Sequence, residues 1–252
     1  MRKLMPVILL YCLMVTLPLV AKPMLLGSHS VWPPYIQNDD RGLSYDIVAA
    51  AFARSGETFA LQTAPFSRAM RLAYNGHIDI IPALWFTQTR AEHFLFSQPY
   101  LYNELIFISQ ATQSVSFSGL ASLTGKNVCM IRGFAYQNLL SGHPKVKVIT
   151  QLHVSECLRQ LARGRVDGMI ADKFAAAYTI THHFQAQTFT LHPQVVASWP
   201  LHIGIVKNHP RAQQLIQLFN QGLAEIIEDG TYNHLLSQYP MISSDLRPIQ
   251  SQ

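Results

Sequence analysis

The histidines and cysteines of this chain could do chemistry, but they fall into no catalytic or metal-binding pattern. The sequence holds 11 His and 3 Cys, yet it contains no G-x-S-x-G, H-E-x-x-H or G-x-G-x-x-G segment. His182 and His183 are adjacent, so on a helix their side chains would diverge by about 100° and could not easily share a metal. Gly119–Lys126 has five residues between its glycines, where a phosphate-binding loop has four. We therefore expect no metal centre, no cofactor and no enzymatic activity.

Two charged residues have the chemistry to bind a small molecule. Arg90 closes the segment Thr87-Gln88-Thr89-Arg90, and its planar guanidinium suits a carboxylate through two parallel hydrogen bonds. Asp172 follows an apolar run, and in a closed cleft its carboxylate would supply acceptors for an ammonium that has lost its water. Each also has a purely structural interpretation. Arg90 would be a charge at the end of a surface helix, and Asp172 would be the N-cap of a helix that begins at Lys173.

Three aromatic residues, Trp32, Tyr35 and Trp85, stand in segments that follow predicted strands. Rings in such places could stack on a ligand side chain or cover an apolar one. Packing beneath the loops is the competing interpretation, and Tyr35 is the ring that we favour as a ligand contact.

The elements that must position these residues alternate between strand-like apolar runs and helical patterns. In the first half, strands are predicted at Met24–His29, Thr58–Thr63 and Ile78–Ala83, and helices at Ser44–Arg54 and Ser67–Asn75. In the second half, strands are predicted at Asn127–Arg132, Lys145–Thr150 and Val166–Ala171, and helices at Phe134–Leu140, Val154–Arg163 and from Lys173. Asp79 and Asp167 are predicted to be structural turn residues. Such alternation predicts an α/β fold with mostly parallel sheets flanked by helices.

The repetition of this pattern indicates two similar lobes. Two apolar segments, Glu104–Gln110 and Leu201–Lys207, could each carry the chain from one lobe to the other as crossover strands. The tail from His209 to Tyr239 is predicted to be helical, with a break at Gly230. We expect one lobe to comprise residues 22–107 and 204–252, and the other residues 108–203. A cleft between two hinged lobes is a natural ligand trap.

The first residues have the pattern of a secretory signal peptide. Arg2 and Lys3 precede an uncharged run from Leu4 to Val20, and Ala21 is the expected end of the segment 1–21. A retained membrane anchor is the alternative, because 17 uncharged residues are just enough to span a bilayer. Without this segment the chain keeps 17 basic and 14 acidic residues, a net charge of +3. No basic block suggests a nucleic-acid partner, and we expect the mature protein in the periplasm.

Cys129 and Cys157 remain after such processing. In an oxidising compartment they could form a disulfide with a sequence separation of 28 residues. Two buried free thiols are equally compatible with the sequence, because Cys packs well as a small hydrophobic residue.

Several short segments occur together in a characteristic order, although each of them alone is only weak evidence for a family. They are Trp32-Pro33-Pro34-Tyr35, Gly42-Leu43-Ser44-Tyr45-Asp46, Gly76-His77-Ile78-Asp79, Thr87-Gln88-Thr89-Arg90, Phe96-Ser97-Gln98-Pro99-Tyr100, the run Leu161–Gly168 with Asp172, Asp229-Gly230-Thr231-Tyr232 and Tyr239-Pro240. Taken together they resemble the family 3 extracellular solute-binding proteins, which include the polar amino-acid receptors of ABC importers. The resemblance covers nearly all of residues 24–240. It implies a two-lobed periplasmic binding protein type II fold, ligand capture by lobe closure, and delivery to a membrane permease.

The resemblance also implies residue roles. Arg90 matches the arginine that binds the ligand α-carboxylate, and Asp172 matches the aspartate that binds the α-ammonium. In the second lobe Phe134 and Ala135 stand where the family has Ser and Thr, so only backbone N–H groups remain there. The stretch Ile81–Phe86 also lacks the usual small hydroxyl residues. The pocket is therefore expected to be more apolar and aromatic than that of a polar amino-acid receptor.

The expected function is thus that of a monomeric periplasmic receptor for an amino acid or a related zwitterion, which serves an ABC importer. Two alternatives remain. Cyclohexadienyl dehydratases resemble the same family, and in such an enzyme Arg90 would anchor a substrate carboxylate while Asp172 transferred protons. The protein could also present its ligand to a membrane sensor.

Overall fold

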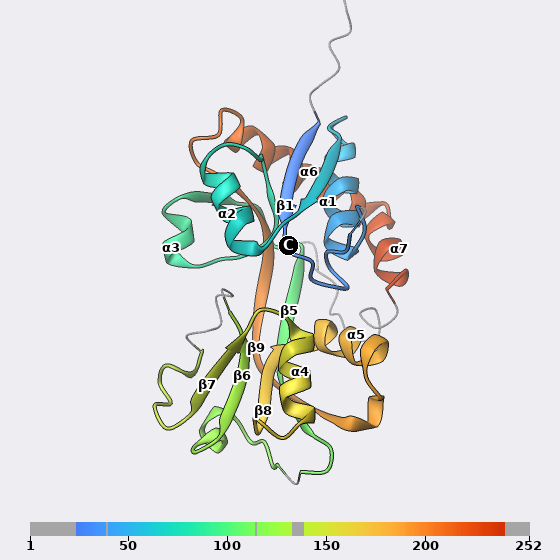
Figure 1. The fold of residues 1–252 in the computed structure, drawn as a ribbon. Helices are drawn as coiled ribbons and strands as arrows, with labels where there is room; N and C mark the ends of the chain where they lie inside the picture. Colours follow the sequence, from blue (N-terminus) through green and yellow to red (C-terminus); the bar gives the residue numbers. More distant parts are fainter. Residues whose placement is uncertain (1–23, 39, 114, 133–138, 240–252) are drawn as a thin grey trace, which may run out of the picture.

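The protein is described here by a computed structural model that covers residues 24–38, 40–113, 115–132 and 139–239. Two lobes lie one above the other in Figure 1, and the strands β5 (Leu101–Gln110) and β9 (Phe189–Val206) run through both. This arrangement confirms the predicted two-lobed α/β fold with two crossover strands. Among the described residues, no helix combines the length and the apolar character that crossing a bilayer requires.

The upper lobe is built from both ends of the described chain. It contains β1 (Leu25–His29), α1 (Leu43–Ala53), β2 (Phe59–Thr63), α2 (Phe66–Tyr74), β3 (Ile81–Trp85), α3 (Gln88–Ala91), β4 (Phe94–Phe96), α6 (Ala212–Glu228) and α7 (Thr231–Ser237). β1 and β2 are parallel, whereas β3 and β4 pair antiparallel with β9. Helix α6 buries Leu215, Phe219 and Ile226 at helical spacing. At Gly222 it lies so close to α1 that a Cβ would be 2.0 Å from the Ala51 carbonyl oxygen.

The lower lobe is also built from strands covered by helices. It contains the 3₁₀ helix Leu120–Leu123, β6 (Asn127–Ile131), β7 (Lys147–Gln151), α4 (Val154–Ala162), β8 (Gly168–Asp172), α5 (Lys173–His183) and the 3₁₀ turn Ala186–Thr188. β6 pairs parallel with β7 and β8, and β5 joins β8 antiparallel. A disulfide between Cys129 of β6 and Cys157 of α4 ties the sheet to a covering helix.

Among the described elements, the differences from prediction that bear on the site are in β3 and β9. β3 begins at Ile81 rather than Ile78 and ends at Trp85, so Trp85 is the last strand residue and not part of the following loop. β9 begins at Phe189, twelve residues before the predicted crossover at Leu201. The predicted helix Phe134–Leu140 lies largely outside the described residues, as does the predicted signal segment 1–21. The predicted lobe boundaries after residues 107 and 203 fall inside β5 and β9, and they stay a prediction.

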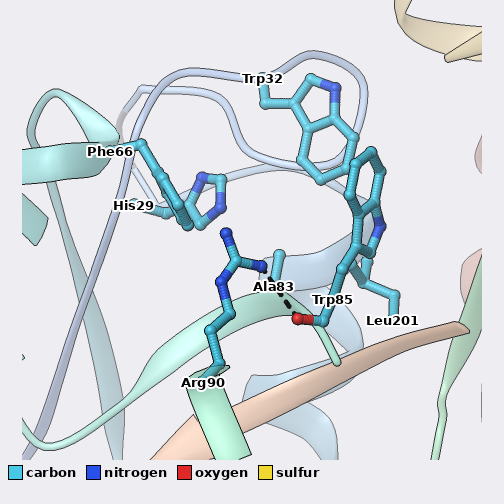
Figure 2. Close-up of a pocket in the computed structure, with 7 residues that line it drawn as sticks. All are labelled: His29, Trp32, Phe66, Ala83, Trp85, Arg90 and Leu201. Atoms are coloured by element: carbon cyan, nitrogen blue, oxygen red, sulfur yellow. Dashed lines mark hydrogen bonds between the residues drawn. The ribbon is translucent and has the colours of Figure 1, made fainter. Parts of the chain in front are cut away.

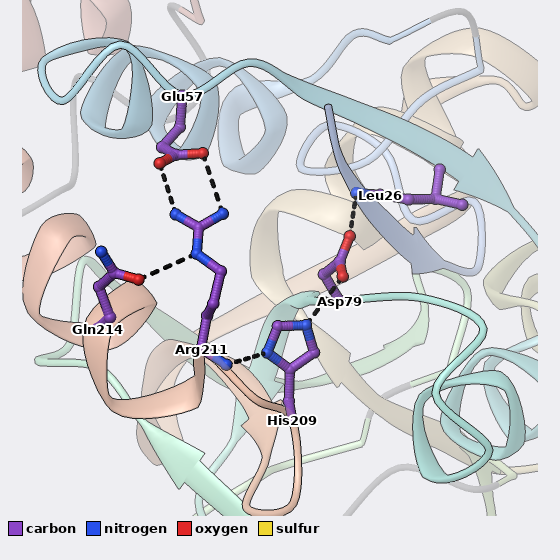
Figure 3. Close-up of polar contacts among 6 residues, drawn as sticks. All are labelled: Leu26, Glu57, Asp79, His209, Arg211 and Gln214. Atoms are coloured by element: carbon purple, nitrogen blue, oxygen red, sulfur yellow. Dashed lines mark hydrogen bonds and ion pairs between the residues drawn. The ribbon is translucent and has the colours of Figure 1, made fainter. Parts of the chain in front are cut away.

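Asp79 and Asp167 have equivalent structural roles in the two lobes. The Asp79 carboxylate accepts from the Leu26 N–H at 2.7 Å, and the Asp167 carboxylate accepts from the Asn127 N–H at 2.7 Å. Each aspartate lies in a turn just before a strand, and it bonds to the backbone near the start of another strand of the same lobe. Asp79 binds β1 in this way, and Asp167 binds β6. Both were predicted as structural turn residues, and the structure confirms this. His209 adds a second contact to Asp79, with 3.0 Å between Nε2 and Oδ1 (Figure 3).

A buried ion pair attaches the start of α6 to the loop before β2 (Figure 3). The Glu57 side chain is completely buried, and its Oε1 lies 2.6 Å from Nη2 of Arg211. Arg211 also donates from Nε to Gln214 at 3.0 Å. Because a buried carboxylate needs a partner, Arg211 holds the C-terminal helices on the upper lobe.

Arg211→Ala is expected to lower the free energy of unfolding by about 3 kcal/mol, because it removes the Arg211 cation from the buried Glu57 carboxylate. Urea denaturation measures this loss. Arg54→Ala is the matched control: Arg54 pairs with Asp229 at the exposed surface of the same lobe, and its loss is expected to change stability little. Equal effects of the two substitutions would contradict the role given to Arg211.

Candidate functional site

Arg90 points into a small cavity of the upper lobe (Figure 2). The cavity is lined by His29, Trp32, Phe66, Ala83, Trp85, Arg90 and Leu201. Its volume is about 10 Å³, which is room for about one water molecule. The short helix α3 positions Arg90. Thr87 is the N-cap of this helix, because its hydroxyl oxygen accepts a hydrogen bond from the Arg90 N–H at 3.2 Å.

The Arg90 guanidinium is held by one hydrogen bond and one aromatic face. Nη1 donates to the Trp85 carbonyl oxygen at 2.9 Å, and the guanidinium carbon lies 5.4 Å from the centre of the Phe66 ring. Among the described residues, the contact with Trp85 is the one side-chain hydrogen bond that Arg90 makes. Burial lowers the pKa of Arg90, but a guanidinium remains protonated in proteins. Donors therefore remain for an anion.

His29 is the other titratable residue in the cavity wall besides Arg90, and the sequence reasoning did not single it out. Burial, together with the nearby Arg90 charge, lowers the pKa of His29 to about 4, against the effect of its backbone hydrogen bonds. Its Nδ1 lies 2.9 Å from the Ser30 carbonyl oxygen. His29 is thus neutral at physiological pH, and Arg90 supplies the positive charge of the described cavity wall.

Asp172 lies in a different cluster, at the point where the two lobes meet. Tyr35 of the upper lobe donates its hydroxyl to both carboxylate oxygens at 3.1 Å. Asn103 of β5 donates from Nδ2 at 3.1 Å, and the Ala175 N–H donates at 2.8 Å. The last bond makes Asp172 the N-cap of α5, which was the structural alternative considered for it. The Asp172 side chain is buried, with a relative exposure of 4%.

Asn103 links this cluster to the Arg90 cavity, and no sequence signal marked it. Its Oδ1 accepts from the Trp85 indole Nε1 at 2.6 Å, while the backbone carbonyl of the same Trp85 accepts from Arg90. A continuous polar chain therefore runs from Arg90 through Trp85 and Asn103 to Asp172 and Tyr35. It crosses from one lobe to the other at the crossover strand β5.

Burial controls the ionisation of the lobe contact. It raises the pKa of Asp172 to about 6, although the bonds from Ala175, Tyr35 and Asn103 oppose this effect. It also raises the pKa of Tyr35 well above its usual range, and the nearby Asp172 charge adds to the shift. Tyr35 is therefore a neutral phenol, and its hydroxyl donates a hydrogen bond to Asp172.

The three tryptophans of the chain form one aromatic cluster at the site. The rings of Trp32 and Trp85 are 5.8 Å apart, and those of Trp85 and Trp199 are 4.8 Å apart. Trp32 also contacts Tyr35 at 4.6 Å. Trp199 was not predicted, because it lies in the part of β9 that the sequence pattern missed.

The structure thus divides the predicted site residues between two linked clusters. Arg90, Trp32 and Trp85 line the cavity, whereas Tyr35 and Asp172 bond to each other beside it. Phe134 and Ala135 lie outside the described residues. The ligand-binding roles of all seven stay predictions. A structural neighbourhood of this kind, with one available cation among aromatic rings, can bind an anion that has an apolar body.

The pKa of Asp172 predicts a pH dependence of stability. The folded protein binds this proton more tightly than the unfolded chain, so the carboxyl stabilises the fold fully below pH about 3.8, and this contribution is lost as the pH rises through about 6. Asp172→Asn removes the effect. Between pH 4 and pH 7, the stability of the wild type should fall relative to the variant by about 1–3 kcal/mol. Urea unfolding at several pH values checks this, and a constant difference, or a relative gain of the wild type, would contradict it.

Residues 24–241 match the sequence profile of the bacterial extracellular solute-binding proteins, family 3. The ABC transporter arginine-binding protein 1 of Escherichia coli (strain K12) is 23% identical over 219 residues, which cover 84% of this chain and 88% of that protein.

Two solved structures have a similar fold. One is a histidine kinase sensor domain with similarity to periplasmic binding proteins, with a TM-score of 0.76 at 18% identity, covering 86% of this chain and 95% of that one. The other is the ancestral amino acid-binding protein AncCDT-1, a precursor of cyclohexadienyl dehydratase. Its TM-score is 0.72 at 20% identity, and the match covers 86% of this chain and 94% of that one.

Proposed function

Because the chain belongs to the family 3 bacterial extracellular solute-binding proteins, we propose that it captures a small organic carboxylate between its lobes. Arg90 carries this proposal. Its guanidinium faces a cavity of the upper lobe, which Trp85 and Asn103 connect to the contact between the lobes, and it makes one side-chain hydrogen bond among the described residues. A carboxylate would occupy the remaining donors with paired, charge-assisted hydrogen bonds.

Transport is the biological role that we propose first. The Escherichia coli relative is an arginine-binding protein of an ABC transporter, so amino acids are the first ligands to test and the permease of an ABC importer is the proposed partner. The protein would act as a monomer in the periplasm after cleavage near Ala21. Lobe closure around the ligand would create the form that the permease recognises.

A sensory role is the second candidate, and it is supported by the similarity to the histidine kinase sensor domain. In that role the closed protein would act on a membrane sensor instead of a permease. An enzymatic role is less well supported. The proton-transfer group of such an enzyme would be Asp172, which is buried, bonded to Tyr35 and Asn103, and not part of the cavity wall around Arg90.

Arg90→Met is expected to weaken binding of a carboxylate ligand by at least about 10-fold, because it removes charge-assisted hydrogen bonds and keeps a side chain of similar length. A thermal-shift screen of amino acids and other carboxylic acids identifies the ligand through the stabilisation that binding causes. Calorimetry then gives the affinities, and mass spectrometry of the recovered ligand tests for turnover.

Arg41→Met is the matched control. Arg41 lines a separate open depression of about 370 Å³ with Val31, Pro33, Gln37, Asn38 and Tyr178. Loss of binding in this variant with retention in Arg90→Met would place the ligand in the depression and contradict the proposal. A chemically altered ligand would instead support an enzyme.

A further inference from the structure

We propose that the ligand is a carboxylate with an apolar or aromatic body and without an α-ammonium group. This inference rests on the proposed function and specifies its ligand class. It follows from the way in which the protein uses its own acceptors at the site.

The cavity wall carries a positive charge, so it can balance a negative charge on the ligand but not a positive one. Arg90 is the one charged residue among those described around it, and His29 is held neutral by burial. The Trp85 carbonyl oxygen already accepts a hydrogen bond from Arg90 at 2.9 Å (Figure 2). A ligand with a carboxylate would gain a partner here, whereas a ligand ammonium would meet a positive charge of its own sign.

The acid that could receive an ammonium is already saturated. A carboxylate offers about four lone-pair sites. On Asp172, Oδ1 faces the Tyr35 hydroxyl and the Ala175 N–H, and Oδ2 faces the Tyr35 hydroxyl and the Asn103 amide. Asn103 offers no acceptor in exchange, because its oxygen is bonded to the Trp85 indole.

An ammonium at this place would therefore have to displace the Tyr35 hydroxyl. That exchange would remove the bond by which the upper lobe holds Asp172 of the lower lobe. Two of the donors, Asn103 and Ala175, would remain in place, since they lie on the crossover strand β5 and on the helix that Asp172 caps. An ammonium buried without a full set of acceptors is strongly disfavoured. Binding of a zwitterion would thus compete with the lobe contact that closes the cleft.

The remaining walls favour an apolar ligand body. Trp32, Phe66 and Trp85 present aromatic rings, and Ala83 and Leu201 present aliphatic groups. Figure 2 shows Phe66 on one side of the Arg90 guanidinium and the two indoles on the other. A cavity of about 10 Å³ has no room for such a body, so the indoles must shift when it enters. Rings that move aside keep contact with a flat or branched hydrocarbon and lose it with a hydrated one.

The test compares ligands that differ in a single group. Phenylalanine, its deaminated form hydrocinnamate and its decarboxylated form phenethylamine share a phenyl ring with two attached chain carbons and differ in the carboxylate and the ammonium. Leucine with isocaproate, and arginine with guanidinovalerate, extend the comparison to aliphatic and basic bodies. Because all three tryptophans of the chain lie at the site, their intrinsic fluorescence reports binding directly, and calorimetry supplies the affinities of the full mature chain.

We expect hydrocinnamate or isocaproate to bind at least about 10-fold more tightly than the corresponding amino acid, because the zwitterion leaves an ammonium without acceptors. Phenethylamine should not bind. Arg41→Met should leave the affinity for the deaminated acid within about 3-fold of the wild type, since Arg41 lines the separate depression and not the Arg90 cavity. Arg90→Met should abolish binding of the deaminated acid.

Equal or tighter binding of the amino acid in every pair would overturn the inference. If that binding also depends on Arg90 and is lost in Asp172→Asn, the proposed function stands and only the ligand class is wrong. If no carboxylate of either kind binds the folded wild-type protein, the proposed function fails, and the inference fails with it. The comparison of ligands on the wild type is decisive even if Asp172→Asn does not fold.

Discussion

The carboxylate of Asp172 is the group on which the arrangement of the two lobes depends. It is buried at the end of β8, where its position is fixed because it caps α5. A buried carboxylate must have its acceptors satisfied, otherwise the lost hydration is not replaced. The protein meets this demand with a phenol from the upper lobe and an amide from the crossover strand β5. The contact between the lobes is therefore a consequence of where one acid is buried.

The same contact is connected to the cavity through Trp85. Its indole N–H bonds to Asn103, and its carbonyl oxygen accepts from Arg90. A ligand that draws the guanidinium away from this carbonyl would act on a residue that also orients the amide beside Asp172. A ligand can shift a protein between two forms only if it interacts differently with them. The polar chain from Arg90 through Trp85 and Asn103 to Asp172 connects the cavity to the lobe contact.

Much of the fold, but only part of the site, could be predicted from the sequence. β1, α1 and α4 lie within one residue of where the sequence predicts them, because apolar runs bounded by turn residues mark them. The first half of β9 does not, because residues before Leu201 are largely exposed or half-buried and include Pro193 and Pro200. The side chains of Arg90 and Asp172 were found by chemistry and family resemblance. Asn103 was missed, since a partner 69 residues away in sequence leaves no local pattern, and His29 was missed because it lies in a strand, where a lone histidine carries no motif.

The coupling between Tyr35 and Asp172 is the quantity that tests this account most directly. A double-mutant cycle with Tyr35→Phe and Asp172→Asn measures it from the free energies of unfolding of four proteins. The account predicts a coupling of about 1–3 kcal/mol, and none for the cycle of Asp172→Asn with Tyr232→Phe, whose buried hydroxyl donates to the Tyr100 carbonyl oxygen instead. Additive effects of Tyr35→Phe and Asp172→Asn would show that this hydrogen bond does not hold the lobes together, and would contradict the account.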